Sequence, residues 1–235
     1  AGKGRDGFYL ELADAFNRQR KTISNGKQAR IAIRKIASGL GAQFMLARRY
    51  TPDAYSPSNF LWSKLLDANG IRLETIADVT APNTAGIIVK KSKKDLITTD
   101  GKLDIAKLLT NVSDGSFAMG YTNPYQSSTG LNFLLTVLNS FAEGDETQML
   151  SPDVASAFEA FQAGVPFVAQ NTLQMRDAAQ GSGVLDALVM EHQSWVNVTG
   201  MNDYEFIPFG VRHDSPLYAT PEADPDEREV LKLFA

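Results

Sequence analysis

The sequence predicts an α/β fold in which helices pack against largely parallel sheets. Apolar stretches with the two-residue period of a strand alternate along the chain with stretches that have the 3.6-residue period of a helix. The connections are short, and no internal repeat or low-complexity linker interrupts the series. Because 43% of the 235 residues are hydrophobic, the chain can build one large domain or two small lobes.

The composition excludes several classes of function. There is no cysteine, so disulfides, thiol catalysis and thiolate metal sites are ruled out. Charged residues make up 21% of the chain and the net charge is -4, which gives no sign of a nucleic-acid partner. The apolar run 131–141 is shorter than the roughly 20 residues that cross a membrane.

The first predicted elements are a helix, a strand and a second helix. Phe8, Leu12 and Phe16 share one helical face, with Asp6 as the predicted N-cap. Residues 28–36 (QARIAIRKI) follow as a strand. The next predicted element is a helix over 38–49 that begins at Ser38.

A short strand and a third helix come next. The strand is the DAY of residues 53–55, and the helix lies within 56–70. Ser58 is the predicted cap of this helix, and Asn69 with Gly70 is its predicted end.

The middle of the chain repeats the alternation. Residues 85–91 are an apolar strand, and 103–112 are a helix with Asp104 as its cap. A short strand at 116–121 then leads into the apolar helix of residues 131–141.

The last third begins with a helix over 151–164, which has Ser151 as N-cap, Pro152 in its first turn and Gly164 as its end. The remaining predicted elements are a helix at 171–181, a stretch at 184–196 that begins as a buried strand, a strand at 204–210 and a terminal helix at 224–235.

Polar side chains gather where four predicted strands end. In α/β sheets ligands bind beyond the carboxyl ends of strands, and a helix N-terminus offers free N–H groups to an anion. Three of these strand ends are rich in hydroxyl groups and open helices. The candidate residues are Ser38, Gly39, Ser56, Ser58, Thr122, Ser127, Ser128, Thr129, Glu191, His192 and Gln193.

Each of these residues also has a purely structural interpretation. A Ser or Thr before a helix is more often only a cap. His192 alone is more often a hydrogen-bonded structural histidine than a metal ligand, and His213 reads as part of a turn near Pro216. Neither a nucleophile-elbow motif nor a phosphate-cradling Gly-Lys-Ser loop is present.

Several segments together resemble type II periplasmic solute-binding proteins. The most specific one is GSFAMGYTNPYQSSTGLNFLLTVLNSF, which resembles the second-lobe motif where a Thr-x-Pro turn leads into a Ser/Thr-Gly helix start. The resemblance covers about residues 5–222 in the order of the family. The supporting segments are KIASGL, PDAYSPSNFLW, LDALVMEHQSWVN and YEFIPFGVRHDSPLYA.

The resemblance implies two α/β lobes, each with a mixed sheet flanked by helices, joined by two crossover strands. Residues 1–84 with 194–235 would form the first lobe, and 85–193 the second. The first strand of the family would precede Ala1. Some exported binding domains of this kind are joined to a von Willebrand A-type domain.

The implied function is non-enzymatic binding of a small polar ligand, with an anion as the preferred class, trapped between the lobes by hinge closure. The implied protein is a monomer of the periplasm or cell exterior, anchored to a membrane by an upstream segment and serving an ABC-type transporter or a sensor. No nucleic acid, catalytic residue, metal or cofactor is expected. The implied ligand contacts are Ser38, Gly39, Ser56, Ser58, Ser127, Ser128, Thr129, Glu191 and His192.

Two other classes of function stay open at this stage. An enzyme on the same fold would place an acid or base with a strongly perturbed pKa in the cleft. An interaction domain that had lost its ligand would fill the cleft with side chains such as Trp62, Tyr121 or Tyr125.

Overall fold

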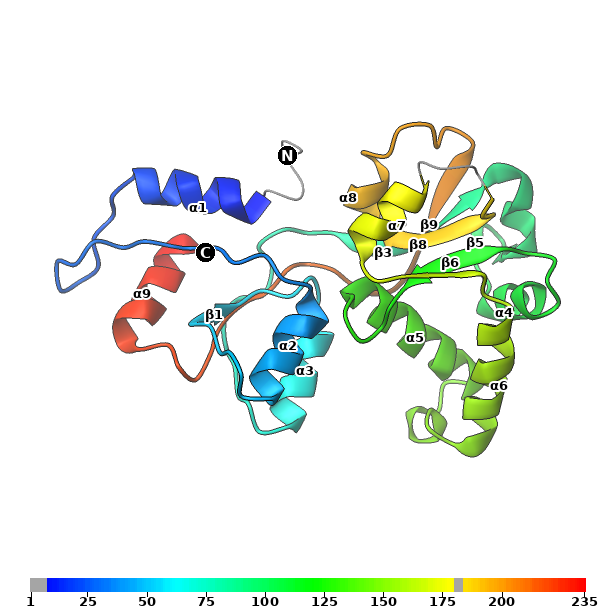
Figure 1. The fold of residues 1–235 in the computed structure, drawn as a ribbon, viewed down its shortest axis with the longest axis horizontal. Helices are drawn as coiled ribbons and strands as arrows, with labels where there is room; N and C mark the ends of the chain where they lie inside the picture. The colour runs from blue at the N-terminus through cyan, green and yellow to red at the C-terminus, as the bar shows by residue number, and fades with distance from the viewer. Residues whose placement is uncertain (1–7, 180–183) are drawn as a thin grey trace. The chain divides into compact units, whose positions relative to one another are not determined.

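A computed structural model describes residues 8–179 and 184–235, which divide into two compact units (Figure 1). Among these residues, the first unit comprises those up to Pro82 together with those from Asp214 onward. The second unit is the continuous stretch Asn83–His213. Each unit has its own main sheet, so no single sheet runs through both.

The second crossing between the units differs from the predicted boundary after residue 193. Strand β9 (Tyr204–Arg212) pairs antiparallel with β3 (Thr84–Lys90) and forms an edge of the sheet in the second unit. Residues 194–213 therefore belong with the second unit, because the ladder between β3 and β9 holds them there.

The first unit has a small antiparallel sheet in the order β1-β10-β2. The strand that comes last in the sequence thus lies in the middle, and the prediction of largely parallel sheets is wrong for this unit. Its elements are α1 (Phe8–Arg18), α2 (Ser38–Leu46), β1 (Ala54–Tyr55), α3 (Leu61–Ala68), β2 (Glu74–Ala77), β10 (Leu217–Ala219) and α9 (Pro225–Phe234).

The core of the first unit joins the two ends of the chain. Phe16 of α1 and Phe234 of α9 are both buried and meet edge to face, with 5.4 Å between ring centroids. Such aromatic pairs add about 0.5–1.5 kcal/mol to the gain from burial. Helix α9 begins with a full capping box between Asp224 and Glu227.

Residues 28–36 do not form the predicted strand, although Ile31 and Ile33 pack against the core of the first unit. Asn17 of α1 is their main partner. Its side chain accepts from the N–H of Ile31 and donates to the carbonyl of Ile31, both at 2.8 Å. A strand needs a ladder of backbone hydrogen bonds to a neighbouring strand. The side chain of Asn17 satisfies the backbone groups of Ile31 only, so it cannot replace such a ladder.

The second unit has a five-stranded mixed sheet in the order β7-β6-β8-β3-β9. Strand β6 runs parallel to β7 and β8, whereas β3 runs antiparallel to β8 and β9. Its further elements are a 3-10 helix at Lys91–Leu96, β4 (Thr98–Thr99), β5 (Lys102–Leu103), α4 (Ile105–Ser113), β6 (Met119–Thr122), α5 (Ser128–Phe141), a 3-10 helix at Glu146–Gln148, α6 (Pro152–Ala163), β7 (Phe167–Ala169), α7 (Thr172–Ala179), β8 (Ala187–Glu191) and α8 (His192–Trp195).

An aromatic cluster centred on Phe133 packs helices against this sheet. Its ring lies 5.1 Å from Tyr121, 5.7 Å from Phe209 and 6.2 Å from Phe161, measured between centroids. All four side chains are buried. Tyr121 is therefore a core residue of the second unit. Trp62 is likewise buried, in the first unit.

Two predicted N-caps of the second unit, Asp104 and Ser151, are confirmed, and Ser127 caps α5. The side chains of Asp104, Ser127 and Ser151 accept from the backbone N–H groups of Lys107, Gly130 and Val154. Each satisfies one of the amide groups that the first turn of a helix leaves without an intrahelical partner.

Helix α2 begins at Ser38, as predicted, with Ala37 at its N-cap. The predicted cap Ser58 is wrong, because helix α3 begins after Phe60. Asn59 Oδ1 instead accepts from the N–H of Leu61, the first residue of α3, at 3.2 Å. The predicted cap Asp6 lies outside the described residues.

Two glycines allow close approaches of backbone in the second unit. A Cβ at Gly130 would lie 2.0 Å from the carbonyl oxygen of Thr122, and one at Gly164 would lie 2.3 Å from that of Val112. Gly130 thus lets the first turn of α5 rest on the end of β6. Gly164 has a φ of -83°, so space and not backbone conformation explains this glycine.

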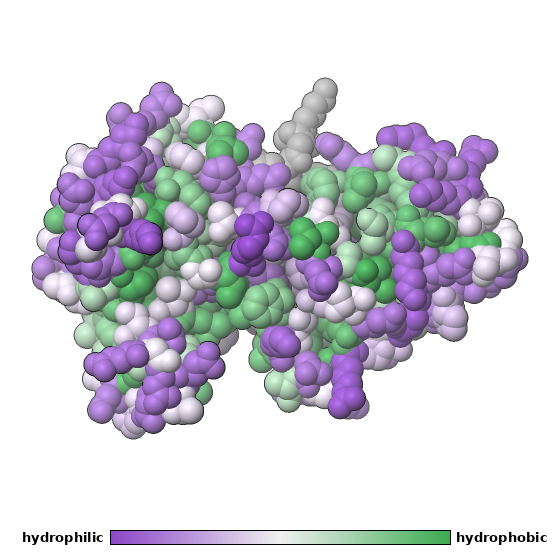
Figure 2. All heavy atoms as spheres, turned by 180° about the vertical axis from the view of Figure 1, so that it is seen from behind, coloured by the Kyte–Doolittle hydropathy of each residue, from purple (hydrophilic) through white to green (hydrophobic). Residues whose placement is uncertain are grey.

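Among the described residues, no helix has the length and apolar character needed to cross a membrane. On the face shown in Figure 2, hydrophilic residues are spread over both units with smaller hydrophobic patches between them.

Candidate functional site

In the second unit, predicted site residues meet where β6 and β8 end and α5 begins. Ser127 closes the turn before α5, where its Oγ accepts from Thr122 Oγ1 at 2.9 Å and from the N–H of Gly130 at 3.4 Å. Ser128 and Thr129 form the first turn of the helix and are almost fully buried. Capping is therefore the role of Ser127, and the next two hydroxyls have other contacts.

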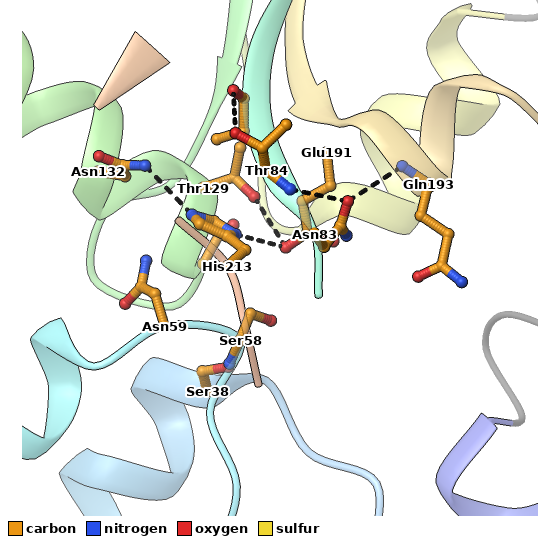
Figure 3. A network of polar contacts seen from close by, with 12 residues as sticks. Ser38, Ser58, Asn59, Asn83, Thr84, Thr129, Asn132, Glu191, Gln193 and His213 are labelled. Carbon is orange, nitrogen blue, oxygen red and sulfur yellow. Dashed lines mark hydrogen bonds and ion pairs between the residues drawn. The ribbon is translucent and has the colours of Figure 1, made fainter. Parts of the chain in front are cut away.

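A polar network connects this helix start to the ends of β8 and β9 (Figure 3). Thr129 Oγ1 donates to Glu191 Oε1 at 3.4 Å, and the same carboxylate oxygen lies 2.8 Å from Nδ1 of His213. His213 is completely buried, whereas the side chain of Glu191 keeps 17% of its surface exposed. Glu191 is thus the part of the network that solvent or a ligand can reach.

The tautomer of His213 follows from Asn132. The side chain of Asn132 pairs with the backbone of Val211, donating to its carbonyl at 2.9 Å and accepting from its N–H at 3.0 Å. This fixes the orientation of the amide, so Asn132 Nδ2 also donates to His213 Nε2 at 3.2 Å. Nε2 is therefore an acceptor, and Nδ1 bears the proton that is donated to Glu191.

Asn83, the first residue of the second unit, ties the start of β3 to the start of α8. Its Oδ1 accepts from the N–H of Thr84 at 2.9 Å and from the N–H of Gln193 at 3.2 Å (Figure 3). This contact holds the turn that follows Glu191 in place.

His192 does not join this network. Its ring lies edge to face on Phe206, with 4.9 Å between centroids, and next to Trp195 at 5.7 Å. Phe206 in turn covers Gly86, where a Cβ would lie 2.3 Å from the ring. Glu191 and His192 were both predicted as ligand contacts, and the histidine that contacts Glu191 in the structure is His213.

In the first unit, Ser38 and Ser58 lie together at the start of α2. Ser38 Oγ accepts from the N–H of Ser58 at 3.3 Å, and Gly39 is buried in the same turn. The hydroxyl of Tyr55 donates to the carbonyl of Ser38 at 2.7 Å. Burial raises the pKa of Tyr55 well above its ordinary value, so this hydroxyl remains a neutral donor.

Ser56 belongs to a second hydroxyl cluster of the first unit. Its Oγ lies 2.6 Å from the hydroxyl of Tyr9, which also contacts Thr80 Oγ1 and donates to the carbonyl of Ser215 at 3.2 Å. This cluster links α1 to the segment that follows β1.

Sequence reasoning missed His213, Asn132 and Asn83. A signal for Asn132 was present, since it opens the polar stripe Asn132, Thr136 and Asn139 on an otherwise apolar helix. For His213 and Asn83 the spacing along the chain carries no signal, because their partners are fixed by the pairing of β3 with β8 and β9.

Among the contacts described for residues 8–179 and 184–235, this network has no arrangement suited to nucleophilic catalysis. Such a site needs a hydroxyl hydrogen-bonded to a histidine nitrogen that can take its proton. Here Nε2 of His213 accepts from an amide, and the hydroxyl of Thr129 is directed to a carboxylate. No group of three potential metal ligands occurs within residues 8–179 and 184–235.

Comparison with known proteins places the fold. No protein-family model and no curated protein matches the sequence. Among solved structures, fructose-6-phosphate-bound AfuA from Actinobacillus pleuropneumoniae is similar, with a TM-score of 0.66, 11% identity and coverage of 98% of this chain and 75% of that chain. The fold is that of periplasmic binding proteins.

Two more structures with this periplasmic-binding-protein fold have similar scores. The sulfate-binding protein SubI from Mycobacterium tuberculosis has a TM-score of 0.62 at 13% identity, covering 97% of this chain and 76% of that chain. Iron-bound HitA from Pseudomonas aeruginosa has a TM-score of 0.63 at 15% identity, covering 98% and 76%. The similarity is structural, because identity stays at 15% or below in all three.

Proposed function

We propose that this chain is a non-enzymatic solute-binding protein for a small polar ligand. The observation that carries the proposal is the network at the start of α5, where buried hydroxyls and a partly exposed carboxylate converge without a nucleophile and base. Binding needs such converging polar groups and no proton transfer. Proteins of similar fold bind sulfate, iron or fructose-6-phosphate.

The ligand class follows from the charge at the start of α5 and from Glu191. The N-terminus of α5 carries a partial positive charge, which favours an anionic group nearby. Glu191 is an acceptor, so the ligand should also have a hydrogen-bond donor such as a hydroxyl or ammonium group. A hydroxylated anion or a zwitterion has both, and a fully deprotonated oxyanion such as sulfate has only the first.

The proposal includes the extracytoplasmic role that the fold suggests. The ligand would be delivered to a membrane transporter or a sensor, and the chain would act in the periplasm or outside the cell as a monomer. Trapping of the ligand between two lobes, membrane anchoring and linkage to a von Willebrand A-type domain stay predictions of the family resemblance.

A thermal-shift panel tests the proposal. It would contain inorganic oxyanions, hydroxy acids, amino acids, sugar phosphates, neutral sugars and divalent metals. A ligand present at 100 times its dissociation constant stabilises the folded state by about 2.7 kcal/mol. We expect a hydroxylated anion or a zwitterion to raise the melting temperature, and Glu191→Gln to reduce that rise.

Two outcomes would contradict the proposal. One is a panel in which no compound stabilises the protein. The other is turnover of an ester, phosphate or amide that is lost in Glu191→Gln or His213→Gln, since that loss would identify an enzyme on the same fold.

A further inference from the structure

The first unit has a basic surface that the solute-binding proposal does not use. Residues 15–52 hold nine Arg and Lys residues and no Asp or Glu. The net charge of the whole chain is nevertheless -4, because Asn83–His213 holds 14 acidic and eight basic residues. The charges of this stretch have one sign, although Asp226 and Glu229 of α9 contact it at Lys27 and Ser24. An excess of positive charge of this kind attracts a partner of opposite charge.

Most cations of this stretch are exposed and have no acidic partner. Lys27 is paired with Asp226 at 2.7 Å, and Lys21 lies over the ring of Phe16. The others form no ion pair within the part of the chain that the structure describes. We call six of them the basic strip: Arg18, Arg20, Arg30, Lys35, Arg48 and Arg49.

Contacts between segments bring the strip together. The N–H of Ala29 donates to the carbonyl of Lys21 at 2.8 Å, which puts Arg30 beside the end of α1. At the other end, the guanidinium of Arg34 lies 4.7 Å from the ring centroid of Tyr50, which brings the segment of Arg34 and Lys35 beside the segment that holds Arg48 and Arg49. Along 30–34, Arg30 and Arg34 are exposed while Ile31 and Ile33 point to the core.

Tyr50 favours a lipid surface over nucleic acid as the partner. Its side chain is 38% exposed among these cations, and an aromatic ring with a polar tip beside arginines suits the headgroup region of a membrane. Single-stranded nucleic acids instead need open aromatic faces on which bases can stack. Arg34 already covers a face of this ring.

We propose that the basic strip docks the first unit on an anionic membrane surface. The guanidinium and ammonium groups would contact lipid phosphates, with the Tyr50 hydroxyl at the headgroup level. The acidic second unit would be repelled by the same surface, so docking would be oriented. This proposal does not depend on the identity of the solute.

Vesicle co-sedimentation of the 235-residue chain tests the proposal. Vesicles of phosphatidylglycerol with phosphatidylcholine should bind the protein at low ionic strength, and high salt should release it. Vesicles of phosphatidylcholine alone should not bind it. Each basic residue near an anionic surface is worth about a fivefold change in affinity.

A matched pair of variants isolates the strip. Arg30→Gln, Lys35→Gln and Arg49→Gln combined remove three charges from it and should weaken binding about a hundredfold. Lys64→Gln, Lys102→Gln and Lys232→Gln combined remove three exposed charges elsewhere, and binding should stay within about twofold. Circular dichroism of both variants checks that they fold.

Three results would overturn the proposal. The wild-type chain could fail to bind anionic vesicles at low salt. The two variants could lose affinity equally, which would mean that only net charge matters. A single-stranded or duplex DNA could bind more tightly than the vesicles, which would make the strip a nucleic-acid surface.

Discussion

Ser127 and Ser128 are adjacent hydroxyls with different roles, and substitution separates them. Ser127→Ala removes the α5 cap and should lower the free energy of unfolding by about 0.5–2 kcal/mol. Ser128→Ala leaves the cap in place, so it should change stability less and should weaken ligand binding. Losing one hydrogen bond to a charged group is worth about 1.5–3 kcal/mol, which is about a 10- to 150-fold loss of affinity.

Urea denaturation and calorimetric titration with the stabilising compound give the two quantities for each variant. If Ser128→Ala leaves affinity unchanged, the first turn of α5 is structural and the ligand lies elsewhere.

His213 supports the network from a fully buried position. His213→Leu keeps side-chain volume but removes one hydrogen bond from Asn132 and one from Glu191. Asn132 stays bonded to Val211 and Glu191 is partly exposed, so neither group is left without a partner. A neutral bond contributes about 0.5–1.5 kcal/mol and one to a charged group about 1.5–3 kcal/mol, so the free energy of unfolding should fall by about 2–4.5 kcal/mol. Chemical denaturation measures this loss.

His192→Gln is the matched control, because His192 is exposed and its substitution should change stability by about 0.5 kcal/mol or less. A larger loss at His192 than at His213 would contradict the assignment of the buried partner of Glu191.

For single residues, the sequence shows which kinds of side chain lie at the site better than it shows which side chains contact one another. Hydroxyls before an apolar run indicated the capped start of α5 correctly, because a cap depends on residues three positions apart. The pairing of Glu191 with His213 spans 22 positions and depends on the register of β3 against β8 and β9. No local pattern contains that register.

Among the elements, α4 offers a test of pH dependence. The pKa of its cap Asp104 is lowered from 3.8, mainly by the hydrogen bond from the N–H of Lys107 and then by that from Thr99. A carboxyl whose folded pKa is lowered stabilises the fold above its unfolded pKa, and that stabilisation is lost as pH falls through the folded value. Asp104 should therefore stabilise α4 at neutral pH and begin to lose this effect as pH falls below about 4.

Asp104→Asn is the variant to compare, because Asn caps about as well and does not titrate. The wild type should be the more stable protein at neutral pH, and its advantage should shrink as pH falls below 3.8. Denaturation midpoints at a series of pH values measure the difference. A difference that stays constant with pH would show that the charge of Asp104 has no role.

Helices and strands were predicted correctly where the residues that determine them are close in sequence. The prediction failed where tertiary contacts determine the structure. The helices that became α4, α5 and α6 follow from a cap and an apolar stripe. Residues 28–36 have the alternation of a strand, yet no described strand pairs with them along their length. Strand β10 was not predicted as a separate element, since three residues carry too little pattern.

At the scale of the whole molecule, the two units differ in continuity. The second unit is the unbroken stretch Asn83–His213 with a five-stranded sheet and its own aromatic core. We expect this stretch, expressed alone, to unfold in one cooperative transition. A fragment ending at Pro82 should not fold, because it lacks β10 and α9.

Circular dichroism melts of the two fragments check this expectation. A cooperative melt of the fragment that ends at Pro82 would contradict it, and so would a non-cooperative melt of Asn83–His213. The sequence alone did not predict this division of the chain, because the predicted boundary after residue 193 would have cut β9 off from the second unit.

The central place of β10 in its sheet also sets an order of events during synthesis. Leu217–Ala219 must pair with both β1 and β2, so the first 82 residues cannot complete their sheet until the ribosome has added some 140 more. At about 5–20 residues per second, this delay lasts roughly 7–28 seconds. Over that interval the nascent chain would present Phe16, Ile31 and Ile33 to chaperones, while the later-made second unit folds first.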